Sequence, residues 1–188
     1  MGLLDVEGAM FRVGDKVNAR TLTTFTGTQM RLPASDRTVH LQFRRFAGCP
    51  ICNLHLREVA SRSVEIQDAG VVEMVVFHSS AGRLRQYQAD LPFAVIADPE
   101  RKLYKEFGVN WSLRSLFHVD AARAAVRGMR QTTSLIGGLA PRENHLGKPA
   151  DFLIDPDGTI KACKYGAHAD DQWSVDELLD LASQKRPT

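Results

Sequence analysis

Residues 39–56 read VHLQFRRFAGCPICNLHL, and this stretch decides the fold. Its first five residues alternate in polarity and are rich in β-branched and aromatic side chains, which predicts a strand. Residues 54–66 place apolar side chains at helical spacing among charged ones, which predicts a helix. Pro50 suits the first turn of that helix, because no intrahelical hydrogen bond needs its missing N–H. The Cys-X-X-Cys pair, Cys49 and Cys52, is therefore predicted at a strand-to-helix junction.

Cys49 is expected at the start of the helix, where unpaired backbone N–H groups and the macrodipole stabilise an anion. That anion is a thiolate, the form of cysteine that attacks disulfides and peroxides. A thiol with a pKa near 8.5 is only about 3% thiolate at pH 7, whereas a pKa near 6.5 gives roughly three quarters. Arg44, Arg45 and His55 are the cations nearest in sequence, but strand alternation points the two arginines to opposite faces. At most one arginine should therefore face the sulfur, while His55 shares a helix face with Cys52.

The composition favours one soluble globular domain over residues 1–188, with 44% hydrophobic and 24% charged residues and a net charge of +2. No basic run with interleaved aromatics indicates a nucleic-acid partner, and no long apolar run indicates a membrane span. Three cysteines are too few for a secreted disulfide framework, and no signal-peptide pattern is present. We therefore expect a cytoplasmic protein, in which a Cys-X-X-Cys pair is redox-active or metal-binding.

Strand and helix signals alternate along the rest of the chain. The turn at residues 155–158, DPDG, should join two antiparallel strands, whereas helices should connect others as crossovers. The predicted class is α/β, a central mixed β-sheet flanked by helices. The further expected elements are a hairpin at 20–32, strands at 71–77, 93–96, 152–154 and 159–163, and helices at 83–90, ending at 107 and starting after Ser174.

Residues 110–148 fit this scheme least well and are expected to form a helical and loop insertion within the single domain. Residues 112–130 have helical character and carry four arginines. This favours a surface helix over part of the sheet; a dimer contact and a binding surface over the cysteines are the alternatives.

From Val13 to the C-terminus the chain resembles the thioredoxin-fold superfamily, specifically its AhpC/TSA peroxiredoxin-like branch. The resemblance implies a thioredoxin-like fold and an antioxidant-type, thiol-based oxidoreductase with a redox-active disulfide and no cofactor. It is carried by the order and spacing of VGDK at 13–16, residues 43–52, LPFAVIADP at 91–99, YKEFGV at 104–109 and FLIDPDG at 152–158.

The chain departs from the peroxiredoxin motif Pro-X-X-X-Thr-X-X-Cys, whose threonine and a distant arginine bind the peroxide. A gapless match makes Cys52 the peroxidatic cysteine and puts Cys49 at the threonine. A match through the Cys-Pro dipeptide makes Cys49 peroxidatic and puts Phe46 at the threonine. Neither register preserves the motif, and Pro149 stands where the family usually has its arginine.

The Cys-X-X-Cys spacing is instead similar to that of thioredoxins, which carry a cis-proline ahead of the strand that faces the cysteines. Pro149 has the corresponding place, so the resemblance implies a cis bond there and a backbone edge that pairs with an extended substrate. In the implied mechanism, Cys49 attacks a protein disulfide and Cys52 resolves the mixed disulfide. If the substrate is a hydroperoxide, a sulfenic acid condenses with the second cysteine, and Arg44 or Arg45 substitutes for the missing peroxide-binding group.

Thiol–disulfide exchange is slightly preferred over hydroperoxide reduction. The expected partners are the substrate, a thioredoxin- or glutathione-type reductant and a second copy in a homodimer. The hypothesis from another class is a non-catalytic module that senses redox state or binds metal. Cys49, Cys52 and His55 offer three zinc-type ligands, and a fourth would come from Cys163 or His168. No metal is expected under the preferred interpretation, in which Cys163 is a small buried residue of a strand.

Overall fold

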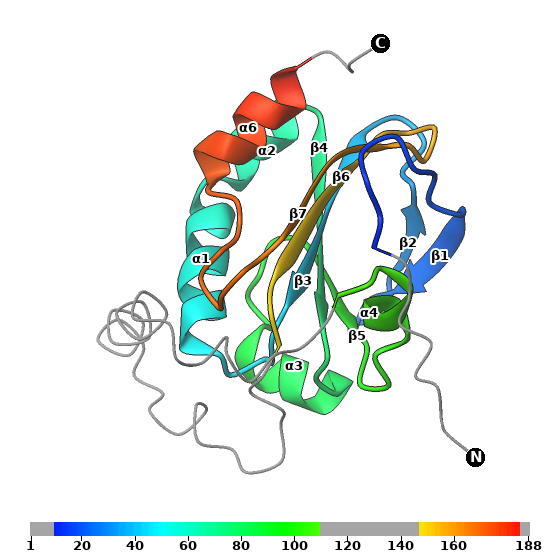
Figure 1. The fold of residues 1–188 in the computed structure, drawn as a ribbon. Helices are drawn as coiled ribbons and strands as arrows, with labels where there is room; N and C mark the ends of the chain where they lie inside the picture. The colour runs from blue at the N-terminus through cyan, green and yellow to red at the C-terminus, as the bar shows by residue number, and fades with distance from the viewer. Residues whose placement is uncertain (1–9, 110–146, 185–188) are drawn as a thin grey trace, which may run out of the picture.

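The computed structural model describes residues 10–109 and 147–184, which form a five-stranded mixed sheet with helices on both faces (Figure 1). The strand order is β5-β4-β3-β6-β7. Strands β3, β4 and β5 run parallel to one another, β6 runs antiparallel to β3, and β7 runs antiparallel to β6. This confirms the predicted class. The strands are β3 (Thr38–Arg44), β4 (Val71–Phe77), β5 (Ala94–Ala97), β6 (Ala150–Ile154) and β7 (Ile160–Tyr165), and a separate hairpin contains β1 (Arg20–Thr23) and β2 (Gln29–Leu32).

Five helices are described, and they are placed close to where the sequence predicts them. Residues 54–66 are not one helix, because the chain breaks at Arg62, whose φ of −108° and ψ of 18° leave the helical region. Within the described residues, no helix is long and apolar enough to cross a membrane. The insertion expected at 110–148 lies almost wholly outside the described residues. The helices are α1 (Pro50–Ser61), α2 (Ser63–Asp68), α3 (Ala81–Tyr87), α4 (Lys102–Glu106) and α6 (Val175–Ser183).

The two faces of the central strand β3 differ in chemistry. On one face Phe43 packs against the rings of Phe107 and Phe152, with centroids 5.1 and 5.8 Å away. This is the main apolar core, on the side of α4 and the β1–β2 hairpin in Figure 1. The other face, under α1 and α6, carries a row of buried polar residues, His40, Gln42 and Arg44. The candidate site lies on this second face, where β3 ends and α1 begins.

Candidate active site

Cys49 is the N-cap residue of α1, as predicted from the position of Pro50. Its backbone is extended, with φ −67° and ψ 116°, and its Sγ accepts a hydrogen bond from the Cys52 N–H at 3.4 Å. Its carbonyl accepts the first helical bond, from the Asn53 N–H at 2.9 Å. A sulfur in this position meets the unpaired N–H groups of the first helical turn, which stabilise a thiolate.

Side chains from the β4–α3 region hold the loop that carries Cys49. The Ala47 N–H donates to Ser79 Oγ at 2.9 Å. Gln88 Nε2 donates to both the Ala47 carbonyl and Asn53 Oδ1, at 2.6 Å each. The loop and the first turn of α1 are thus fixed to one another through Gln88, which limits how far the two sulfurs can separate.

The two cysteine sulfurs differ sharply in acidity. Burial alone would raise the pKa of Cys49, but the hydrogen bond from the Cys52 thiol, the Arg45 guanidinium and the N–H groups of Cys52 and Ile51 together lower that pKa to about 6. Arg45 Nη1 lies 3.7 Å from Cys49 Sγ. Burial, followed by the adjacent Cys49, raises the pKa of Cys52 well above its ordinary value. At neutral pH the pair therefore holds one thiolate, on Cys49, and one proton, on Cys52.

Replacing Arg45 by glutamine should raise the pKa of Cys49 by about 1 to 2 units, because the nearby positive charge is lost. The thiolate absorbance at 240 nm, followed against pH in a Cys163→Ser background, measures this shift. Arg37→Gln removes the same charge at the opposite end of β3 and should leave the titration where it is. An unchanged midpoint in Arg45→Gln would show that the Cys52 thiol and the helix end set the pKa of Cys49 without Arg45.

Arg44 turns away from the cysteines, which agrees with the prediction that at most one of the two arginines faces the sulfur. Its Nη2 lies 2.6 Å from Asp151 Oδ1 and donates to Gln42 Oε1 at 2.6 Å. The same nitrogen donates to His55 Nε2 at 3.1 Å. Burial and the positive charge of Arg44 lower the pKa of His55 well below its ordinary value. His55 is therefore a neutral acceptor for Arg44.

The polar row on β3 continues into a buried charge cluster made of His40, Arg44, Glu73 and Asp151. His40 Nδ1 lies 2.9 and 3.0 Å from the two Glu73 oxygens, and its Nε2 lies 3.2 Å from Asp151 Oδ1. Burial alone would lower the pKa of His40, but Glu73 and Asp151 raise it to about 9. Arg44 and His40 hold the pKa of Asp151 below its usual range against the effect of burial. Two cations and two anions thus balance under α1.

The sequence prediction missed His40, Glu73 and Asp151. Polar residues at every second position of an otherwise buried strand, His40, Gln42 and Arg44, were the available signal. On a central strand with both faces covered, such a row needs partners of opposite charge on the neighbouring strands. Glu73 on β4 and Asp151 on β6 supply them.

The charge cluster should make stability fall at alkaline pH once the cysteines are removed. The pKa of His40 is about 9 in the folded protein and near 6.5 when unfolded, so its contribution is complete below pH 6.5 and disappears as pH rises to 9. Cys49 acts in the opposite sense, because its pKa falls from 9.0 to about 6 on folding, so its contribution is lost as pH falls from 9 to 6. In the natural protein, the change in stability with pH that comes from His40 therefore offsets the change that comes from Cys49.

Urea unfolding of a Cys49→Ser/Cys52→Ser variant at pH 6.5 and pH 9 measures the effect of His40 without the opposing effect of Cys49. We expect a loss on the order of 3 kcal/mol between the two pH values. Equal stability at both pH values would contradict a charged His40.

The structure corrects the expectation for Pro149. In the described part of the chain the one cis peptide bond is Leu32–Pro33, so the bond before Pro149 is trans. The Pro149 carbonyl accepts the Gly166 N–H at 2.9 Å, which holds the trans segment against the end of β7. A Cβ on Gly166 would lie 2.8 Å from Pro149 Cγ and 2.6 Å from the Asp171 carbonyl, so only glycine allows this approach. The cis-proline edge expected from the thioredoxin resemblance was wrong.

The positions of Cys163 and His55 bear on the metal hypothesis. Cys163 on β7 is half-buried and packs into the apolar core with Phe152, on the face of the sheet opposite α1. His55 directs Nε2 at Arg44 and so does not join Cys49 and Cys52 as a ligand set. Among residues 10–109 and 147–184, no group of three or more His, Cys, Asp or Glu side chains is arranged to hold a metal ion.

Strand β3 pairs with β4 in parallel and with β6 in antiparallel orientation, and a Cys-X-X-Cys pair starts the helix that follows β3. This arrangement defines a thioredoxin-fold protein with a redox-type dithiol. The profile of the AhpC/TSA family matches residues 13–163, and the chain belongs to this family. No curated protein matches the sequence significantly.

Solved structures that resemble the chain include peroxiredoxins and a thiol–disulfide protein. Peroxidoxin BcpB from Mycobacterium tuberculosis superimposes with a TM-score of 0.66 at 18% identity, covering 93% of this chain and 97% of its own. A putative thiol:disulfide interchange protein DsbE from Chlorobium tepidum gives 0.60 at 18% identity, covering 93% and 100%. A peroxiredoxin-like protein from Aquifex aeolicus gives 0.65 at 15% identity, covering 94% and 88%. At these identities the likeness shows the fold, and it includes proteins of both redox types.

Proposed function

We propose that the protein is a thiol–disulfide oxidoreductase in which Cys49 attacks and Cys52 resolves. The observation that carries this proposal is the Cys49 sulfur at the helix N-cap, with its pKa lowered to about 6 and the Cys52 thiol as its hydrogen-bond donor. Family membership supports thiol-based redox chemistry. The expected setting is the cytoplasm, with a thioredoxin- or glutathione-type reductant.

The proposed cycle transfers two electrons to the substrate. The Cys49 thiolate attacks one sulfur of the substrate disulfide, and the other sulfur leaves as a thiolate. With Cys49 in a mixed disulfide, its negative charge no longer raises the pKa of Cys52. Cys52 then gives its proton to the substrate thiolate that left in the first step. The Cys52 thiolate attacks the Cys49 sulfur, which releases the second substrate sulfur as a thiolate. The product is a Cys49–Cys52 disulfide, which the reductant converts back to two thiols.

Hydroperoxide reduction is the second candidate, and two observations favour it. Arg45 lies beside Cys49 Sγ, where a guanidinium can also hydrogen-bond a peroxide oxygen. Both cysteines are buried, at 0% and 1% exposure, which a small oxidant tolerates better than a protein does. Here the thiolate attacks the distal peroxide oxygen, and the alkoxide or hydroxide that leaves takes a proton from the solvent to become alcohol or water. Cys52 then condenses with the Cys49 sulfenic acid, and one water is released.

Parallel assays test the proposal. The protein is reduced beforehand, freed of reductant and mixed with insulin or with cumene hydroperoxide, and the rate at which Cys49 and Cys52 are oxidised is compared between the two substrates. Faster oxidation by insulin supports disulfide exchange, whereas faster oxidation by the hydroperoxide transfers the assignment to the second candidate. A protein that has two titratable thiols and is oxidised by neither substrate would overturn both.

A further inference from the structure

One side chain, Gln88, is bonded to the chain on both sides of the two cysteines. Residues 45–49, which join β3 to α1, are called the cysteine loop from here on. Gln88 Nε2 donates to the Ala47 carbonyl in this loop and to Asn53 Oδ1 in α1, at 2.6 Å each. Ala47 lies two residues before the Cys-X-X-Cys segment, and Asn53 lies directly after it. The two bonds therefore tie the cysteine loop to the first turn of α1.

Gln88 is itself held firmly in place. It is the C-cap residue of α3, where its N–H donates to the Leu84 carbonyl at 2.8 Å. Its side chain is buried, and Leu84 packs in the same apolar cluster as both cysteines. A primary amide has two N–H hydrogens, so Gln88 can satisfy both of its acceptors at the same time. Gln88 is thus a fixed anchor for the cysteine loop.

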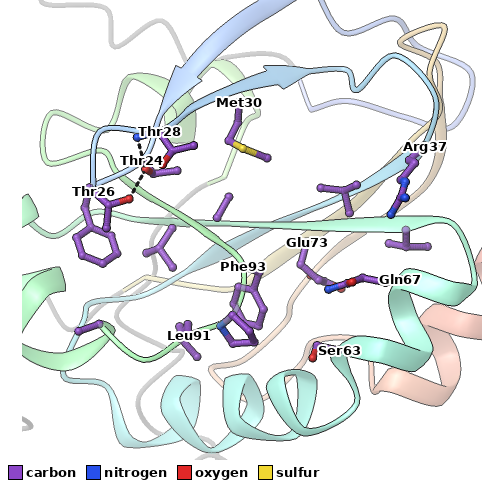
Figure 2. Close-up of a pocket in the computed structure, with 17 residues that line it drawn as sticks. Thr24, Thr26, Thr28, Met30, Arg37, Ser63, Gln67, Glu73, Leu91 and Phe93 are labelled. Carbon is purple, nitrogen blue, oxygen red and sulfur yellow. Dashed lines mark hydrogen bonds between the residues drawn. The ribbon is translucent and has the colours of Figure 1, made fainter.

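The chain that follows Gln88 lies beside a cleft of about 540 Å³ (Figure 2). Leu91 and Phe93 line this cleft, whereas Gln88 and the two cysteines do not. The residues that accept from Gln88, Ala47 and Asn53, also lie outside the lining of the cleft. The Gln88 side chain is therefore directed at the cysteine loop and not into the cleft.

We propose that Gln88 is a positioning residue for closure of the Cys49–Cys52 disulfide. It acts on the sulfurs through Ala47 and Asn53, and it takes no part in the chemistry of the substrate. The inference rests on the proposed function, because it assumes that the two cysteines form a disulfide in the cycle. It holds for a disulfide substrate and for a hydroperoxide, since both oxidise the pair to the same Cys49–Cys52 bond.

The physical reason is the main-chain freedom that disulfide closure removes. Closure fixes the cysteine loop relative to α1, and a loop that is free in the dithiol loses entropy at that step, which opposes oxidation. The two bonds of Gln88 already fix the loop in the dithiol, so less entropy remains to be lost. Without these bonds the dithiol gains freedom that the covalently closed form cannot gain to the same extent. Loss of Gln88 should therefore shift the equilibrium toward the dithiol.

The test is the equilibrium of the full-length protein with glutathione, in a Cys163→Ser background. Each protein disulfide that forms consumes one glutathione disulfide and releases two glutathione thiols. Acid quenching, alkylation and intact-mass measurement give the oxidised fraction at each glutathione ratio. Gln88→Met removes both donated hydrogen bonds at nearly constant volume, and it should lower the equilibrium constant for disulfide formation about tenfold. Asn53→Ala removes one of the two bonds from the other side and should lower the constant about threefold.

Two control variants separate positioning from a general loss of stability. Gln67→Met makes the same change at an exposed glutamine of α2, labelled in Figure 2, and should leave the constant unchanged. Ser174→Ala removes the N-cap of α6, which lowers overall stability without touching the cysteine loop, and should also leave it unchanged.

The outcomes distinguish the positioning role from the redox function itself. An unchanged constant in Gln88→Met, or in Asn53→Ala if Gln88→Met does not fold, would overturn the positioning role and leave the redox function in place. An equal fall in Ser174→Ala would do the same. If the parent protein formed no Cys49–Cys52 disulfide at any glutathione ratio, both the positioning role and the proposed function would be overturned.

Discussion

Replacing Cys49 by serine is expected to lower the turnover of disulfide or peroxide substrates on the order of 1,000-fold or more. The reason is that Cys49 is the sulfur ionised near neutrality, whereas Cys52 keeps its proton. The Cys52→Ser variant should instead still form the mixed disulfide through Cys49, but it should not resolve that disulfide. Intact-mass measurement after exposure to glutathione disulfide should show one glutathione bound to Cys52→Ser and none to Cys49→Ser.

The matched control for these variants is Cys163→Ser. Its sulfur packs on the face of the sheet opposite α1, so its loss should leave turnover and glutathione capture unchanged. Glutathione captured by Cys49→Ser but not by Cys52→Ser would reverse the assigned roles. That result would place the attacking sulfur at Cys52, as the gapless peroxiredoxin match has it.

Asp151→Asn should lower the free energy of unfolding by about 3 to 5 kcal/mol. The change removes the carboxylate that lies 2.6 Å from Arg44, and it leaves Glu73 as the one anionic partner of His40 in the charge cluster. Arg44 and His40 are both buried away from water. Removing one member of a buried ion pair is costly because the remaining charge is neither solvated nor paired. Urea unfolding at pH 7, comparing midpoints at an unchanged m-value, measures the loss.

Asp176→Asn is the control for Asp151→Asn. Asp176 also contacts an arginine at 2.6 Å, Arg62, but its side chain is 80% exposed. Water replaces the lost contact there, so little change in stability is expected. If the two variants lost equal stability, the burial of the charge cluster would not explain the loss in Asp151→Asn.

The sequence was sufficient for the elements that depend on local pattern. The alternation of residues 39–43, the buried run 71–77 and the position of Pro50 predicted β3, β4 and the start of α1. The order of motifs predicted the family. Strand alternation also established that Arg44 and Arg45 cannot both face Cys49, but it could not say which one does. That choice depends on Asp151, which captures Arg44 from a neighbouring strand.

Features that depend on distant contacts were not predictable in the same way. His40 and Asp151 are 111 positions apart in the chain, and they meet only because β3 pairs with β6 in one particular register. The break at Arg62 lies within a segment whose apolar pattern is helical on both sides of it, so local propensity does not reveal the break. The close approach of Pro149 to Gly166, which accompanies the trans bond before Pro149, was likewise not contained in the resemblance.

The burial of both sulfurs has a kinetic consequence. A reagent can react only while the two sulfurs are transiently exposed, so the observed rate is the opening equilibrium multiplied by the intrinsic rate of the thiolate. A partner that binds the opened form preferentially would shift that equilibrium and so accelerate its own reduction. Discrimination among oxidants would then arise from the work of opening rather than from a shaped specificity pocket.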